Sequence, residues 1–211
     1  MARRPKRTRA NRTSCPDPTT RRLVAKILRV VGTPEADEMI TELEAAGLKN
    51  WATYTRNLHL DKDLGPRTNA WEEQHIDPRG VWLDNHDAAQ QYINQLWTDL
   101  GYADPPVVTL LTADEIEERQ HLVASANKKE IRLRWDDVLD TVIIHEAAHV
   151  IARRLGICDL HGPNWFGVYL SLLERMPERF DMAALKASAA AAGLEWAPLP
   201  AALESPMAEA A

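Results

Sequence analysis

The chain has 211 residues, 45% of them hydrophobic, and a formal net charge of −6, which suits one globular domain with attached tails. Its two cysteines cannot build a disulfide framework or a four-cysteine zinc ribbon. No run approaches the roughly 18 apolar residues of a membrane span, and the N-terminus lacks the apolar core of a secretory signal, so we expect a soluble, intracellular, cytoplasmic protein.

The N-terminal residues 1–20 are basic and rich in polar residues and proline, which predicts a disordered arm. Residues 1–30 hold ten Lys or Arg side chains and one acid, so the rest of the chain has 15 basic and 30 acidic residues. Such an arm can make weak contacts with nucleic acid, or it can be a solvated tail without a partner. The acidic remainder would not itself be attracted to DNA.

Residues 21–83 predict a helical N-terminal segment followed by a connection. Apolar residues recur with helical spacing over residues 21–31, and a second helix is indicated over residues 33–46, where proline stands at the start. A third short helix over residues 51–58 remains open. Residues 60–83 are rich in Pro, Gly, Asp and Asn, which predicts a long connection.

The main domain is expected over residues 84–195. It should begin with an amphipathic helix over residues 87–100 and a strand over residues 107–111. Residues 121–125 and 130–134 predict a hairpin, since they alternate apolar and polar side chains on either side of a turn. This order of elements indicates an α+β fold with a small antiparallel sheet flanked by helices.

The best-marked helix follows the hairpin. Asp136 and Asp137 are expected in its first turn and Arg153 and Arg154 in its last, an arrangement that matches the helix dipole. Gly156 then stands where a helix commonly ends. Two further helices are indicated after it, and a loose C-terminal tail should cover residues 196–211.

The central helix is apolar nearly all round, except for His145, Glu146 and His149. Such a helix is buried, and buried ionisable groups must be paired or bound to metal. Two histidines four residues apart lie on one face and can bind one ion, while Glu146 can contact a water without being a ligand. The alternative is a pair of satisfied core histidines with an incidental glutamate.

A catalytic zinc needs a third protein ligand and an open fourth position. The continuation HExxHxxGxxH fails, because Ala152 and Leu155 replace its glycine and third histidine. Two candidates remain from spacing: Glu174, 25 residues after His149, and His161, which lies 12 residues after it and precedes a helix start.

The motif HEAAH followed by HGPNWFGVYLSLL resembles the SprT/Spartan-like zinc metallopeptidases. It resembles more closely a group of small actinobacterial and actinophage metallohydrolases with HExxH followed by HGPxF, over residues 87–193. The resemblance implies a zincin-like fold and a Zn2+ ion held by His145, His149 and His161, with Glu146 as general base. Trp165 stands where the family usually has phenylalanine. The zinc ribbon of many SprT-like proteins is absent, so DNA-crosslink repair is not implied.

We therefore expect a zinc metallopeptidase that cleaves a peptide or protein. A non-catalytic phage structural or DNA-associated protein on the same scaffold is the alternative, as is hydrolysis of a non-peptide amide. In zincins an extended substrate adds to a sheet edge, and residues 130–134 are the candidate edge. Tyr169 and Arg134 are the candidates for stabilising an oxyanion.

Overall fold

The computed structural model describes residues 27, 30–31, 33–118, 123–157 and 159–198. The basic arm, most of the expected helix over residues 21–31 and most of the tail lie outside these residues. By packing, the chain divides into two compact units, Met1–His59 and Leu60–Ala211. None of the described helices is both long and apolar enough to cross a membrane.

The first unit contains helix α2 (Glu35–Ala45) and the beginning of helix α3. Helix α2 has three acids in its first turn, and Gly47 adopts a positive φ of 77° just beyond its end. Both features favour the ends of a helix at these positions, close to the predicted range of 33–46. A small apolar core holds this unit together; its buried members are Ile27, Ala36, Ile40, Leu43 and Ala52.

Helix α3 runs from Lys49 to His75, so the connection predicted over residues 60–83 is wrong for its larger part. An internal proline such as Pro66 costs a helix about 3 kcal/mol, which is why the sequence favours a loop. Packing of the helix outweighs this cost: the Trp71 side chain is buried, and its ring nitrogen donates a hydrogen bond to the Ser188 hydroxyl.

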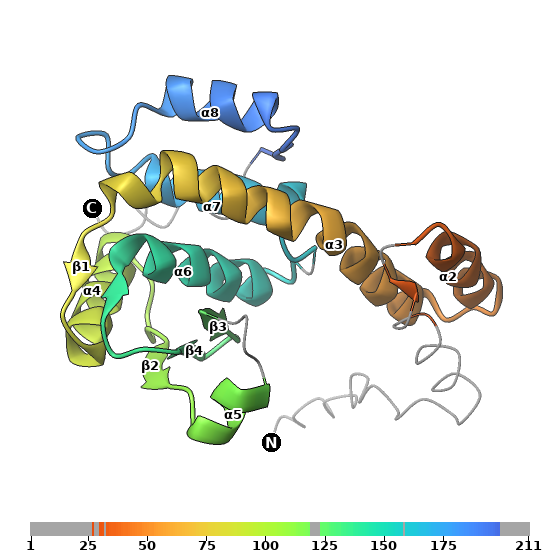
Figure 1. The fold of residues 1–211 in the computed structure, drawn as a ribbon, viewed down its shortest axis with the longest axis horizontal. Coiled ribbons are helices and arrows are strands. Elements are labelled where there is room, and N and C mark those ends of the chain that lie inside the picture. The colour runs from red at the N-terminus through yellow and green to blue at the C-terminus, as the bar shows by residue number, and fades with distance from the viewer. Residues whose placement is uncertain (1–26, 28–29, 32, 119–122, 158, 199–211) are drawn as a thin grey trace, which may run out of the picture. The chain divides into compact units, whose positions relative to one another are not determined.

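The second unit continues with a short 3-10 turn and alternating strands and helices (Figure 1). These are η1 (Asp77–Arg79), β1 (Trp82–Leu83), α4 (His86–Asp99), β2 (Val107–Leu110) and α5 (Ala113–Glu118). Helix α4 matches the predicted amphipathic helix. The Asn85 side chain accepts a hydrogen bond from the Ala88 backbone and so caps its start.

The prediction of an antiparallel sheet is correct for the hairpin and wrong for the third strand. Strands β3 (Ala124–Ala126) and β4 (Glu130–Leu133) pair antiparallel as expected, but β2 pairs with β4 in parallel. The sheet is therefore mixed, in the order β2-β4-β3. Strand β4 has a neighbour on each side, so the predicted edge at residues 130–134 is wrong: β2 and β3 are the outer strands.

The central helix α6 (Asp140–Arg154) starts later than predicted. Residues Val138 and Leu139 form strand β5, which pairs antiparallel with β1, so Asp136 and Asp137 precede the helix. Asp140 takes their place in the first turn, where its carboxylate forms an ion pair with Arg179. The end of the helix is as predicted, with two arginines in its last turn and a glycine of positive φ after it.

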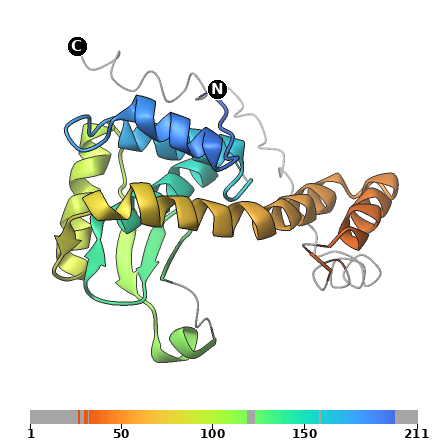
Figure 2. The ribbon, with the colours of Figure 1, turned by 45° about the horizontal axis from the view of Figure 1, so that its top comes forward.

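Helix α6 lies in the middle of the second unit. The three-stranded sheet lies on one side of it, and α7 (Pro163–Leu173) and α8 (Met182–Ala191) lie on the other (Figure 2). Its buried residues, including Ile143, Ile144, Ala147 and Val150, join both layers in one apolar core. The helix that carries the predicted site is thus buried on nearly all sides, and the fold is of the mixed α+β class.

Candidate metal centre

Three histidines from two segments of the second unit meet at one point. His145 and His149 lie one turn apart on α6, and His161 lies in the loop before α7. Each offers a ring nitrogen, and these nitrogens lie within 4.8 Å of one another. The three side chains are therefore close enough to bind one metal ion.

Two of the rings are oriented by carboxylates. The Nδ1 atom of His145 lies 2.8 Å from Glu72 Oε1, and that of His161 lies 2.6 Å from Asp61 Oδ1. Because an ionised carboxylate only accepts hydrogen bonds, each Nδ1 must carry the proton. In a neutral ring the Nε2 atom is then the free electron-pair donor.

The two free donors lie close together. The Nε2 atoms of His145 and His161 are 3.2 Å apart, close to the roughly 3.3–3.4 Å that separates two ligands 2.0–2.1 Å from a tetrahedral zinc. Two unprotonated nitrogens at this distance repel each other, so a proton or a cation must lie between them. The donor set therefore fits a metal ion.

The surroundings of the cluster raise the pKa of one ring and lower the pKa of another. Burial lowers the pKa of His145, but the charge and hydrogen bond of Glu72, with the charge of Glu146, outweigh it and raise the pKa to about 9. Burial and the charges of the other two rings lower the pKa of His149 well below its usual value. His149 is thus a neutral ring, as a metal ligand must be.

Glu146 follows His145 on α6 and is also buried. Its Oε2 atom has no hydrogen-bond partner among the described residues, an arrangement that is costly unless a polar group is supplied from outside. Burial raises the pKa of Glu146 to about 7, although the positive charges of His145 and Arg153 oppose the rise. A carboxylate with such a pKa is suited to accept and return protons near neutral pH.

Aromatic side chains of α7 line the other side of the cluster. The Trp165 ring lies 4.7–4.9 Å from each of the three imidazole centroids and is nearly parallel to that of His149. Tyr169 stacks on Trp165 and is completely buried. Burial, and then the charge of Glu72, raise the pKa of Tyr169 well above its usual value. The indole at position 165 thus forms a wall of the cluster.

The turn before α7 holds the third histidine. Leu160 adopts a positive φ of 51°, which is uncommon for a residue with a side chain, and it turns the chain immediately before His161. A Cβ atom on Gly162 would come within 2.8 Å of Asp159, so this position requires glycine. The Asp159 carboxylate accepts the backbone N–H of Asn164 and caps α7.

The alternative third ligand and one of the two oxyanion candidates make contacts outside the histidine cluster. Glu174, the alternative third ligand, is exposed at the end of α7 and pairs with Lys186 at 3.5 Å. Of the two oxyanion candidates, Tyr169 lies beside His145, with ring centroids 5.7 Å apart. The guanidinium group of Arg134 lies over the ring of Trp135.

Sequence reasoning missed Asp61 and Glu72, because they lie in the segment predicted as a connection. A signal was present: Asp61, Gly65, Thr68 and Glu72 are spaced by four, three and four residues, which places them on one face of a helix. That face is polar, whereas amphipathic helices are found by an apolar face, so the pattern was overlooked.

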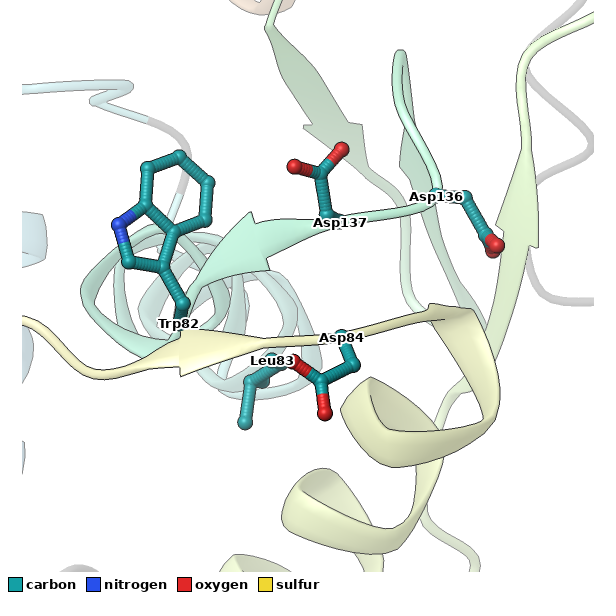
Figure 3. Close-up of a pocket in the computed structure, with 5 residues that line it drawn as sticks. All are labelled: Trp82, Leu83, Asp84, Asp136 and Asp137. Atoms are coloured by element: carbon teal, nitrogen blue, oxygen red, sulfur yellow. The ribbon is translucent and has the colours of Figure 1, made fainter.

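A pocket of about 560 Å³ lies elsewhere on the second unit. It is lined by Trp82, Leu83, Asp84, Asp136 and Asp137, with the Trp82 ring and the Asp137 carboxylate on the same side of the two short strands (Figure 3). None of these residues belongs to the histidine cluster. Asp136 is already bound by the ring and the backbone N–H of His86.

No family model matches the chain, and neither a curated protein nor a solved structure gives a significant match. Residues of the chain itself therefore carry the functional argument.

Proposed function

We propose that the chain is a zinc-dependent metallohydrolase with a zincin-like fold, and that it acts as a metallopeptidase. One observation carries the proposal. Three histidine nitrogens lie within 4.8 Å of one another, and the next residue after His145 is a buried glutamate with an oxygen that has no partner in the described part of the chain. The likeness of HEAAH and HGPNW to SprT-like metallopeptidases supports the same conclusion.

Three imidazoles suit zinc, copper, iron or nickel. Zinc is favoured because three protein ligands with an open fourth position are the usual catalytic arrangement. When bound, zinc would supply a Lewis acid that lowers the pKa of a water and polarises a carbonyl group. The residues His145, His149 and His161 would hold it.

Glu146 would act as the general base. Its carboxylate would accept a proton from the attacking water and return it to the leaving amine, a role for which a pKa of about 7 is well placed. Trp165 excludes water from one side of the cluster, since it is buried against all three imidazoles.

The substrate would be an extended peptide paired with an outer strand of the sheet. Strand β3 is the better candidate, because it is an outer strand that packs directly against α6. The central strand β4 has no free edge for this purpose.

The test compares wild-type protein with Glu146→Gln, using Glu174→Gln as an exposed control. Glutamine has nearly the same shape but does not accept the proton, so hydrolysis of a proteome-derived peptide library should fall about 10²–10⁴-fold. Zinc content and melting temperature should stay unchanged, and Glu174→Gln should retain activity. Undiminished cleavage by Glu146→Gln would refute this mechanism. No cleavage by the wild type would favour a non-catalytic protein on this scaffold.

A further inference from the structure

The polar face of α3 lies against the histidine cluster. Asp61, Gly65, Thr68 and Glu72 form this face, and the last three are buried. Figure 1 shows the later part of α3 running alongside α6, the helix that carries two of the histidines. Burying polar groups is costly unless they are hydrogen-bonded or paired, so the carboxylates on this face need partners.

Glu72 finds its partner in His145. Only 8% of the residue is exposed, and its Oε1 atom accepts the Nδ1 proton of His145 at 2.8 Å. A buried carboxylate without such a donor would be strongly unfavourable. The contact also fixes the plane and the tautomer of the ring.

Asp61 acts in the same way on His161 and adds a second contact. Its Oδ1 atom accepts a hydrogen bond from His161 Nδ1 at 2.6 Å. The same oxygen lies 3.3 Å from the backbone nitrogen of His161. The side chain and the main chain of the third histidine are thus held by one carboxylate.

Gly65 of α3 lies beside the third histidine. A Cβ atom at this position would lie 3.4 Å from His161 Nδ1 and 3.6 Å from the Asp61 carboxylate. A methyl group at this position would therefore make ordinary van der Waals contact with the third histidine. Glycine inside a helix costs about 1 kcal/mol relative to alanine, and the contacts at this position leave room for a methyl group.

We propose that α3, a helix outside both histidine motifs, supplies the outer shell of the metal centre through Glu72 and Asp61. The inference rests on the proposed metal site and names two positioning residues for it. By fixing Nδ1–H on two rings, the carboxylates direct both Nε2 electron pairs at one point and increase the basicity of the rings. Loss of such partners typically weakens metal binding 10–100-fold.

The experiment measures zinc affinity of the full-length, metal-depleted protein by competition with a chromophoric chelator. We expect Glu72→Ala and Asp61→Ala to bind zinc 10–100-fold more weakly than wild type. Glu72→Gln should fall between wild type and Glu72→Ala, because an amide oxygen still accepts the Nδ1 proton but carries no charge. The control is Glu73→Gln, which changes the adjacent, exposed glutamate and should leave the affinity unchanged.

Two further measurements separate positioning from general destabilisation. The visible spectrum of the cobalt-substituted protein reports ligand geometry and should change in Glu72→Ala but not in Glu73→Gln. Hydrogen exchange over residues 60–75 should slow when zinc binds to wild type, and the slowing should be lost in the double variant Asp61→Ala/Glu72→Ala. The exchange experiment compares bound with metal-depleted states of the same variant, and the cobalt spectrum reports the metal-bound site alone, so reduced stability does not by itself produce either result.

The outcomes distinguish the two proposals. If wild type binds zinc and the Glu72 and Asp61 variants bind it as tightly as Glu73→Gln, the outer-shell role is refuted while the proposed function stands. If wild type fails to bind zinc, both proposals are refuted. Weakened binding with an altered cobalt spectrum supports the role of α3.

Discussion

The position of the proton on His145 and His161 determines which nitrogen of each ring can bind a metal ion. Each ring donates a hydrogen bond from Nδ1–H to a carboxylate, at 2.8 and 2.6 Å, and the two Nε2 atoms lie 3.2 Å apart. The same two contacts that orient the rings also make them better electron-pair donors. Two electron-pair donors held this close together are suited to bind one cation.

The assignment of the third ligand is tested by paired variants. His161→Ala removes one of three nitrogens from the cluster, so purified protein should lose most of its zinc. Glu174→Ala should retain about one zinc per chain, because this glutamate is exposed and paired with Lys186. Metal content is measured by mass spectrometry on protein prepared without added chelator. Retention of zinc by His161→Ala would show that the ligand assignment is wrong.

The binding of zinc should depend on pH through His145. In the metal-free protein the pKa of this ring is about 9, so at pH 7 Nε2 carries a proton that zinc must displace. Below pH 9 the proton increasingly competes with zinc, and affinity should rise as pH increases from 7 towards 9. Calorimetry in buffers of different ionisation enthalpy should detect about one proton released per zinc at pH 7. A release of zero would contradict this account of the charges.

At the scale of the elements, two helical glycines have different surroundings. A Cβ atom on Gly167 of α7 would lie 2.2 Å from the Ala197 carbonyl oxygen, which is fixed by a hydrogen bond from Ala197 N to Pro163 O. A Cβ atom on Gly65 of α3 would make only ordinary contacts. The C-terminal segment thus crosses α7 where the helix has no side chain.

These surroundings predict opposite effects of alanine on stability. Gly167→Ala should lower the free energy of unfolding by about 1–3 kcal/mol, because backbone must move to relieve the clash. Gly65→Ala should leave it unchanged or raise it by up to about 1 kcal/mol, since alanine is the better helix former. Urea denaturation of both variants measures the difference. Equal destabilisation by the two would contradict the packing described here.

The local signals in the sequence predicted most elements of the second unit but not their assembly. Helix α4, the β3–β4 hairpin and the end of α6 follow from capping residues and apolar periodicity, which act over a few positions. The parallel pairing of β2 with β4 joins residues far apart in the chain, and nothing local specifies it. The start of α6 was missed for the same reason, because residues 138–139 pair with β1.

The site, too, contains residues that local spacing predicts and residues that only the folded structure brings in. The HExxH spacing predicted His145, Glu146 and His149 as one group, because it is a property of one helix. His161 was one of two candidates from spacing and was implied by the family resemblance, and the structure brings the three histidines together. The carboxylates of α3 were not predicted, since Pro66 and the polar composition of residues 60–75 favour a connection over the helix that their spacing would fit. Burial of that helix against the core, visible only in the folded molecule, overrides its local preference.

At the scale of the whole molecule, positive charge is concentrated in the first 30 residues and negative charge in the rest of the chain. Residues 1–30 carry ten basic side chains and one acid, and the remaining residues carry twice as many acids as bases. Any contact with nucleic acid should therefore depend on the basic arm, because an acidic body repels phosphate. Deletion of residues 1–22 should abolish DNA binding at low salt, measured by fluorescence anisotropy with a labelled duplex. If the full-length chain binds, its affinity should fall steeply as salt rises, since counterion release drives such contacts. Binding by the truncated chain would instead locate a nucleic-acid site in the acidic part of the protein, against this expectation.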